Sequence, residues 1–184
     1  MRSAALLVLA CTLAPGLTQE PPPAPTPTPS APAPEALTPD AMRSRERNVI
    51  IAVSTVVHAE KTYAALNGGF FDEIGCLMRP TECRPTLAAD ILPFLDPSYG
   101  WLEPKLGYAR AFHPGPKPTP DEVQKAGASA TSLKAFAYTA TPLQPGVTGT
   151  RAFCGDSSGK LCVTADGRDP PVKEGRCEPC KKME

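Results

Sequence analysis

The feature that most constrains the fold is one long periodic stretch, residues 37–67. Its apolar residues recur at spacings of three and four, the pattern of a helix that buries one face. They are Met42, Val49, Ile50, Val53, Val56, Val57, Tyr63 and Ala64. Many of them are β-branched and would also suit a strand, but the length of the stretch favours one helix of about 25 residues. The rest of the domain is expected to pack on this helix.

Both ends of the stretch carry helix-boundary residues. Thr38 can cap the first turn, Pro39 suits the first helical position, and Asp40 lies at the positive end of the helix dipole. Gly68 and Gly69 follow the last periodic residue and can supply a left-handed C-cap. The sequence therefore predicts where the helix begins and ends.

Residues 1–19 have the composition of an export signal. Arg2 precedes a short apolar run, residues 4–10, which is too short to span a membrane. The segment Val8–Cys11 resembles a bacterial lipobox, in which the cysteine is lipidated and becomes the mature N-terminus. The alternative is cleavage by the ordinary signal peptidase a few residues later. Removing Cys11 would leave six cysteines, an even number that can all pair.

Residues 20–36 are expected to be a disordered linker that precedes one globular domain, residues 37–184. Eight prolines lie between Pro21 and Pro34, and they favour a polyproline II conformation. The formal net charge of zero gives no electrostatic footprint for nucleic acid. Seven cysteines in a short chain indicate an oxidising compartment, so we expect an exported protein of a bacterium, in the periplasm or on the outer membrane.

The region after the helix, residues 70–106, is expected to be irregular because prolines interrupt it. One helical turn is predicted at 87–90, and Trp101 is expected to pack this region on the core. Strands are predicted at 107–112, 133–140, 150–154 and 161–164, with a helical turn at 120–125. The fold class is therefore α+β, with one long N-terminal helix packed on a three- to four-stranded antiparallel sheet.

The six remaining cysteines are expected to form structural disulfides. Cys154 and Cys162 flank a predicted three-residue hairpin loop, residues 157–159, which places them opposite each other. The predicted pairs are Cys76–Cys83, Cys154–Cys162 and Cys177–Cys180. The main alternative pairs a cysteine of the tail with a cysteine of a strand. A redox-active 177–180 pair and a zinc site are less favoured, because no framing element or second pair of suitable spacing is present.

Several segments in this order resemble the headgroups of type IV pilins and type II secretion pseudopilins. The segments Ala59–Tyr63 and Gly68–Phe71 resemble the end of the pilin helix and the turn after it. Leu106–Tyr108 resembles the opening of the first strand, and Ala140–Pro142 with Gly146–Phe153 resembles a later run of these heads. Asp156 and Gly159 match the turn before the last strand. The resemblance covers about residues 37–165 and implies a pilin-like fold.

The chain departs from the pilin pattern at its N-terminus. Pilins begin with a basic leader and about twenty apolar residues, which hold the subunit in the membrane and polymerise it. The corresponding position here has a signal sequence and a proline-rich linker, and Val49–Ala59 is too short to span a membrane. The resemblance therefore implies a head without its polymerising stem, and we expect a monomer or small oligomer.

Two further motifs have an ordinary structural interpretation beside a functional one. Gly155–Gly159 resembles the nucleophile segment of chymotrypsin-like proteases, but neither His58 nor His113 has the flanking pattern of the catalytic histidine, and a hairpin turn explains the segment. Three aspartates could bind calcium, as C-terminal loops of some pseudopilins do, although solvated turn residues are the favoured interpretation. They are Asp156, Asp166 and Asp169.

These features predict a non-enzymatic exported protein that acts through protein–protein contacts at the cell envelope. A role beside a type IV pilus or a type II secretion system is expected from the resemblance. The alternative is an independent periplasmic binding module on a pilin-like fold. No cofactor, metal, nucleic-acid or small-molecule partner is expected, and Cys11 is the predicted lipidation site.

Overall fold

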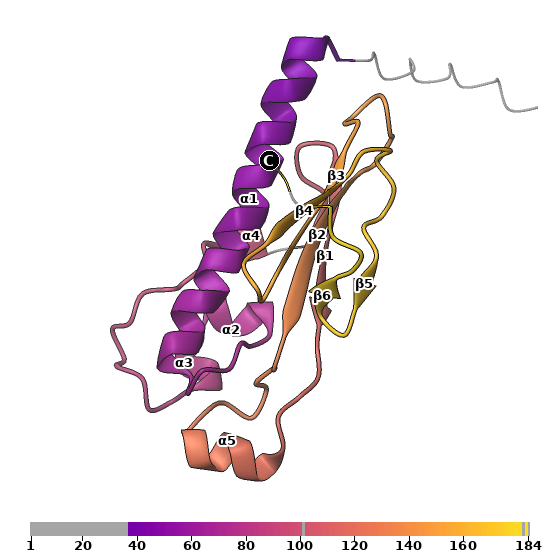
Figure 1. The fold of residues 1–184 in the computed structure, drawn as a ribbon. Coiled ribbons are helices and arrows are strands. Elements are labelled where there is room, and N and C mark those ends of the chain that lie inside the picture. The colour runs from indigo at the N-terminus through magenta and orange to yellow at the C-terminus, as the bar shows by residue number, and fades with distance from the viewer. Residues whose placement is uncertain (1–36, 101, 182, 184) are drawn as a thin grey trace, which may run out of the picture. The chain divides into compact units, whose positions relative to one another are not determined.

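The computed structural model describes residues 37–100, 102–181 and 183. These residues form a helix-and-sheet domain (Figure 1). The predicted export signal with Cys11 and the proline-rich segment 20–36 lie outside the described residues, and so does Trp101.

Helix α1 spans Pro39–Leu66, 28 residues, and begins where the sequence predicts. The Thr38 hydroxyl oxygen accepts a hydrogen bond from the Ala41 N–H at 3.3 Å, which satisfies one of the free donors of the first turn. Asp40 lies in that turn, near the positive end of the helix dipole. At 1.5 Å per residue, α1 is about 42 Å long.

The C-terminal end of α1 also has the predicted glycine geometry. The N–H of the cap residue Asn67 bonds to the Tyr63 and Ala64 carbonyl oxygens, and Gly68 follows with a φ of 63°. A Cβ on Gly68 would lie 2.7 Å from atoms of Ala126, so a side chain is excluded by space as well as by conformation.

The segment between α1 and the sheet is more helical than the sequence predicts. It forms α2 (Ile74–Met78), α3 (Pro80–Cys83) and α4 (Pro97–Gly100), whereas residues 87–90 form turns. The expectation of an irregular region with one helical turn at 87–90 is therefore wrong. Pro80 and Pro97 begin short helices instead of preventing them, because the first helical position needs no N–H donor.

Four strands form one antiparallel sheet in the order β1-β2-β3-β4. Their bounds are β1 Tyr108–Pro114, β2 Phe136–Pro142, β3 Ala152–Asp156 and β4 Leu161–Thr164. The predicted α+β class, with one long N-terminal helix on an antiparallel sheet, is confirmed. Between β1 and β2, the helix α5 (Pro120–Ala126) begins with a capping box of Thr119 and Glu122, which confirms the predicted turn at 120–125.

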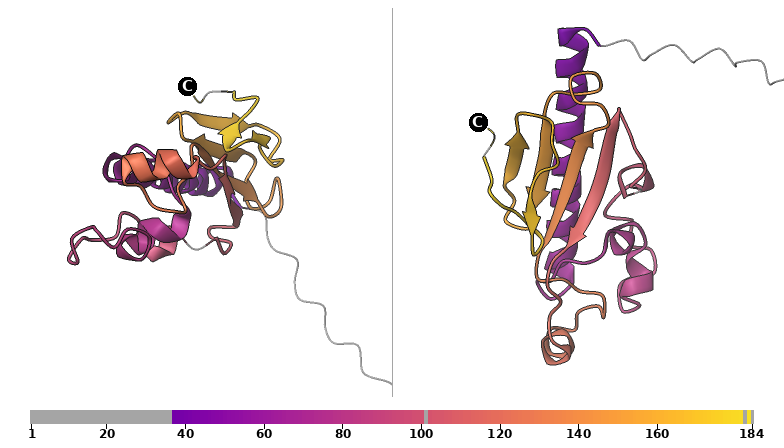
Figure 2. Two further views of the ribbon diagram at one scale, coloured as in Figure 1. Left: turned by 90° about the horizontal axis from the view of Figure 1, so that it is seen from below. Right: turned by 90° about the vertical axis from the view of Figure 1, so that its right-hand side faces the viewer.

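The sheet is covered on both faces (Figure 2). On one face, Val53 and Val56 of α1 pack in the main core with Tyr138 and Phe153 of the sheet. On the other face, a smaller core lies under the C-terminal segment, which forms the short strands β5 (Val172–Lys173) and β6 (Arg176–Cys177). The sequence did not predict this hairpin. Cover on both faces explains why nearly every residue of β2 is buried.

Helix α1 is long and apolar enough, by length and composition, to cross a membrane. Core helices of soluble proteins pass the same test, and one side of α1 is buried against the sheet. The segment Val49–Ala59, which is too short to span a membrane, is only the central part of this longer helix.

Candidate functional site

The structure corrects two of the three predicted disulfides. Cys76–Cys83 joins α2 to α3 as predicted, with a Cα–Cα distance of 5.6 Å. The other pairs are Cys154–Cys177 and Cys162–Cys180, the tail-to-strand alternative, and not Cys154–Cys162 and Cys177–Cys180.

The register of β3 and β4 is as predicted, but the expected Cys154–Cys162 disulfide does not form. Cys154 and Cys162 are direct cross-strand partners, as the hairpin predicts. Both belong to the small core under the C-terminal segment, so each meets a cysteine of that segment. The Cys177 N–H donates to an oxygen of the Asp156 carboxylate at 3.0 Å and fixes β6 beside β3. The two tail disulfides therefore attach the C-terminal segment to the sheet.

The three C-terminal aspartates do not come together as a calcium site. Asp156 is buried, and its second oxygen accepts bonds from the N–H and hydroxyl of Ser158, which shape the hairpin turn. Asp166 is exposed and pairs with Arg168, and Asp169 is exposed. Over residues 37–100, 102–181 and 183, no three His, Cys, Asp or Glu side chains could hold a metal together.

The protease-like segment 155–159 forms the turn between β3 and β4. Its three-residue loop and the φ of 82° at Gly159 confirm the predicted hairpin. His58 is exposed on α1, and a ring nitrogen of His113 lies 2.9 Å from the Thr139 hydroxyl. Burial lowers the pKa of His113, with an opposing effect from Asp169. Within the described residues, no hydrogen bond joins either histidine to a serine of the loop.

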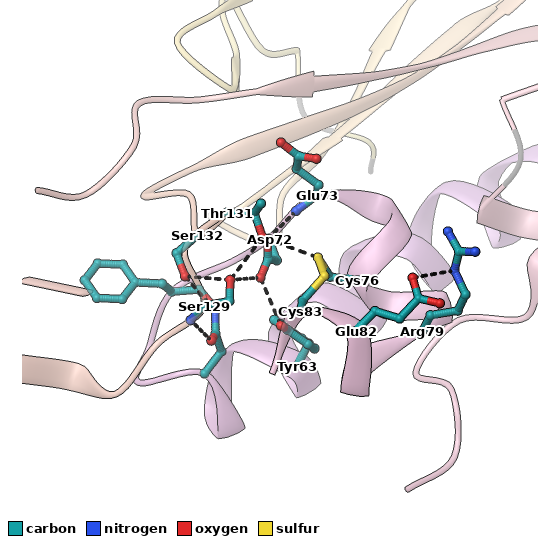
Figure 3. Close-up of a disulfide and its surroundings, with 12 residues drawn as sticks. Tyr63, Asp72, Glu73, Cys76, Arg79, Glu82, Cys83, Ser129, Thr131 and Ser132 are labelled. Atoms are coloured by element: carbon teal, nitrogen blue, oxygen red, sulfur yellow. Dashed lines mark hydrogen bonds and ion pairs between the residues drawn. A yellow bond between two sulfur atoms is a disulfide. The ribbon is translucent and has the colours of Figure 1, made fainter. Parts of the chain in front are cut away.

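A buried polar cluster joins the end of α1 to the loop before β2 (Figure 3). The Asp72 carboxylate accepts hydrogen bonds from the Tyr63 hydroxyl at 2.9 Å, from the Ser129 hydroxyl, and from the Glu73 N–H at 2.8 Å. Asn67 accepts from the Ser129 N–H at 2.8 Å. The Cys76–Cys83 disulfide lies beside this cluster.

Glu60 is the second acid of this region and is fully buried in α1. One of its oxygens accepts from the Asp72 N–H at 3.2 Å, and the other has no partner among the described residues. Burial raises the pKa of Glu60 well above its usual range. The hydrogen bond from the Asp72 N–H acts to lower this pKa, and the charge of the Asp72 carboxylate acts to raise it. Full burial within α1 favours a structural role for Glu60.

Glu46 joins the first half of α1 to the loop before β3. One oxygen accepts from the Thr150 N–H at 2.9 Å and from its hydroxyl at 2.7 Å, and the other pairs with the Arg151 guanidinium at 2.7 Å. Burial acts to raise the pKa of Glu46, but the hydrogen bonds of Thr150 and Arg151 and the Arg151 charge together lower it. Glu46 is therefore an ionised anchor between helix and sheet.

A groove lies between α1 and the β1 side of the sheet, and we call it the α1–β1 groove. Its floor is apolar and comes from buried residues, including Val49 and Val53 of α1 and Ala140 of β2. Two aliphatic side chains stand at its rim, Ile51 at 57% exposure and Leu106 at 42%. Large exposed aliphatic side chains beside an apolar depression are typical of an interaction surface.

Leu106 is held at the rim by a strained turn. Lys105 and Tyr108 exchange both backbone hydrogen bonds, each at 3.0 Å, so Leu106 and Gly107 form a two-residue hairpin turn. Their φ values of 56° and 75° match a type I′ turn, which asparagine or glycine usually occupies. A leucine at positive φ costs about 1 kcal/mol or more. The turn therefore presents an apolar side chain where a small polar residue would be less strained.

Two cations also line the α1–β1 groove. The Lys105 ammonium lies 5.2 Å from the centre of the Tyr99 ring, and Arg110 bonds to the Glu103 carbonyl oxygen at 2.7 Å. Neither cation has an ion pair within the part of the chain that the structure describes. An apolar groove with two such cations can bind an apolar group that carries a negative charge.

The groove was not predicted from the sequence, because its residues come from α1, α4, β1, β2 and the turn before β1. One signal was present, however. Ile51 is a large apolar residue outside the buried stripe of α1, but single exposed apolar residues are common on protein surfaces, so this signal is weak.

Comparison of the sequence with protein-family models and with curated proteins, and of the fold with solved structures, finds no match. Function is therefore inferred from the geometry and from the motifs of the sequence.

Proposed function

We propose that this chain is an exported, non-enzymatic, pilin-like protein that acts through protein–protein contacts at the bacterial cell envelope. In this proposal it is an accessory to a type IV pilus or a type II secretion system. The observation that carries the proposal is the α1–β1 groove, with Ile51 and Leu106 exposed at its rim. Exposed apolar side chains of this size are stabilised by burial against a partner, at about 25 cal/mol per Å² of apolar surface.

Contacts between the pilin-like segments support the family assignment within this proposal. The Tyr108 hydroxyl, from the segment Leu106–Tyr108, donates to the Arg151 carbonyl oxygen at 3.0 Å. A Cβ on Gly149 would lie 1.9 Å from that hydroxyl, so the position requires glycine. Two segments that resemble pilin heads, distant in sequence, thus depend on each other in the fold.

The size of the groove favours a protein partner over a small molecule. The groove encloses about 180 Å³, less than the roughly 300–1,000 Å³ of typical ligand pockets. Two adjoining hollows of about 390 and 430 Å³ are larger, but they are shallow, open depressions. A narrow groove among shallow hollows is better suited to a side chain of another protein than to an enclosed ligand.

The three disulfides are compatible with an oxidising location outside the cytoplasm. They are consistent with the export signal predicted at residues 1–19. The proposal places the protein in the periplasm or, through lipidated Cys11, at the outer membrane.

Chemical cross-linking in intact cells tests this proposal. The tagged protein would be cross-linked in its own host and purified under denaturing conditions, so that only covalent adducts remain. The proposal predicts a discrete adduct with another envelope protein, identified by mass spectrometry. Absence of any heterologous adduct, with the tagged protein present at its normal level, would contradict it.

A further inference from the structure

We propose that the α1–β1 groove receives one bulky apolar side chain of a partner polypeptide, next to a carboxylate of the same partner that binds Lys105 and Arg110. This inference rests on the proposed protein-binding function and names the chemistry of the segment that is bound. Its apolar part and its charged part follow from separate observations.

The apolar part follows from the size and lining of the groove. Val49 and Val53 are 3% and 1% exposed, so the floor is preformed by the core. An apolar cavity of about 150 Å³ can hold a benzene ring. The volume of about 180 Å³ therefore suits one aromatic or leucine side chain. Ile51 and Leu106 at the rim would cover the backbone on either side of that side chain.

The charged part follows from the free hydrogen-bond donors of the two cations. Arg110 has five N–H groups and makes four bonds, all to the carbonyl oxygens of Ser98, Tyr99 and Glu103. Lys105 has three and makes one bond, to Ser98. Two donors on Lys105 are thus left for a ligand, whereas the Tyr138 hydroxyl competes for the last donor of Arg110. Carbonyl contacts hold both cations in place without neutralising them, which favours an incoming carboxylate.

The surrounding charges reduce this preference without removing it, because the charge of Lys105 also acts on the Asp96 carboxylate and lowers its pKa after the larger effect of the Ser98 hydrogen bonds. Asp96 and Glu103 line the adjoining hollow with the same two cations, but neither carboxylate forms an ion pair with them among the described residues. An Asp96 oxygen instead accepts from the Ser98 N–H at 2.8 Å. A partner carboxylate therefore meets two unpaired cations.

The continuity of the surface favours a polypeptide as the occupant. Ile51 lines the groove and also lines the shallow hollow on its other side, which reaches Ile50 and Leu161. A chain that inserts a side chain into the groove can continue over Ile51 into this hollow. A small carboxylic acid would leave both the Ile51 ridge and the hollow uncovered.

The test uses three short blocked peptides, titrated into the full, exported and disulfide-bonded protein labelled with ¹⁵N. Their sequences are Asp-Phe-Asp, Lys-Phe-Lys and Asp-Ala-Asp. We expect amide shifts around Ile51 and Leu106 with Asp-Phe-Asp. We expect binding about two- to fivefold weaker with Lys-Phe-Lys, the size of a partly exposed ion pair. Binding of Asp-Ala-Asp, which lacks the ring, should be weaker again.

Two variants test the two parts of the groove separately. Ala52→Phe fills the groove from α1 and should abolish binding of Asp-Phe-Asp, whereas Ala65→Phe, at an exposed position of the same helix, should not. Lys105→Glu should remove the preference for the acidic peptide, whereas Lys117→Glu should preserve it. Circular dichroism of each variant establishes that it is folded.

Equal binding of the three peptides, or shifts remote from the groove, would overturn the inference. Shifts that grow with protein concentration in the absence of peptide would overturn it too, because a second copy of this chain would then occupy the groove. If adducts in cells persist in folded Ala52→Phe and Lys105→Glu, the inference fails and the proposed function stands. If the wild-type protein forms no adduct, the proposed function itself fails.

Discussion

At the residue scale, the close approach of α1 to the sheet depends on Val53 and Gly155. Val53 is 1% exposed, and a Cβ on Gly155 would lie 2.9 Å from one of its methyl carbons. The glycine in β3 therefore lets the helix backbone approach the sheet, and the valine fills the space that remains.

Val53→Asp should destabilise the domain by several kcal/mol, because it buries an unpaired charge at this contact. The matched change Ser54→Asp, at an exposed neighbouring position, should leave the melting temperature nearly unchanged. Thermal unfolding followed by circular dichroism compares the two. Equal melting temperatures for Val53→Asp and the wild type would show that the buried face of α1 is assigned incorrectly.

The two buried glutamates of α1 should have opposite effects on the pH dependence of stability. The pKa of Glu46 is lowered from 4.5 in the folded protein, so its stabilisation is present above that value and is lost as the pH falls through the folded pKa. The pKa of Glu60 is raised from 4.5, so stability is lost as the pH rises above that value.

Glu60→Gln should therefore match the wild type near pH 4 and become more stable than the wild type towards pH 7. Glu46→Gln should match the wild type at pH values below the lowered folded pKa of Glu46, where the carboxyl is protonated, and should become less stable than the wild type towards pH 7. Urea unfolding with intact disulfides across this range measures the free energy of unfolding of each variant. The same pH trend in both variants would refute these assignments.

At the element scale, the sequence predicted those features of the helices and turns that depend on residues close together in the chain. The ends of α1, the three-residue loop at 157–159 and the capping box of α5 depend on residues close in sequence, and all three are observed. The short helices after α1 and the tail hairpin were missed, because they are stabilised mainly by packing and disulfides.

The disulfide pairing was missed for a related reason. The sequence predicted the register that places Cys154 opposite Cys162, but not that the tail covers this side of the sheet. The α1–β1 groove likewise joins residues that are far apart in sequence. Only the position of Ile51 outside the apolar stripe indicated it.

A tryptic digest under non-reducing conditions tests the tail pairing directly. Cys177 and Cys180 lie in one expected peptide, residues 177–181, while Cys154 and Cys162 lie in two others, residues 152–160 and 161–168. The observed pairing predicts one species of all three peptides. A two-peptide species of 152–160 with 161–168, beside an internally bridged 177–181, would instead support the pairing first predicted.

At the scale of the whole domain, the elements that pack on the sheet determine which surfaces stay available for a partner. Helix α1 covers one face, and the disulfide-bonded C-terminal segment covers the part of the other face formed by β2, β3 and β4. The backbone of the last residues also pairs with β4, through Val163 N–H to the Lys181 carbonyl oxygen at 3.0 Å. The outer side of α1 and the α1–β1 groove are thus left for contact with a partner.

The predicted lipid anchor has its own test, since Cys11 lies outside the described residues. Cys11→Ser should move the protein from the membrane fraction to the soluble periplasm, because one lipidated cysteine would attach the chain to the membrane. Fractionation of cells that express each form measures this. A soluble wild-type protein with an N-terminus near Gln19 or Glu20 would contradict the lipobox interpretation.

The most direct test of the account is photo-cross-linking in the host from single positions of the domain. A photoreactive residue would replace Ile51 at the rim of the α1–β1 groove or, as the control, Leu143, which is 52% exposed and does not line the groove. The account predicts a discrete adduct with an envelope protein from position 51 and a weaker one or none from position 143. A strong adduct from position 143 with none from position 51 would contradict it.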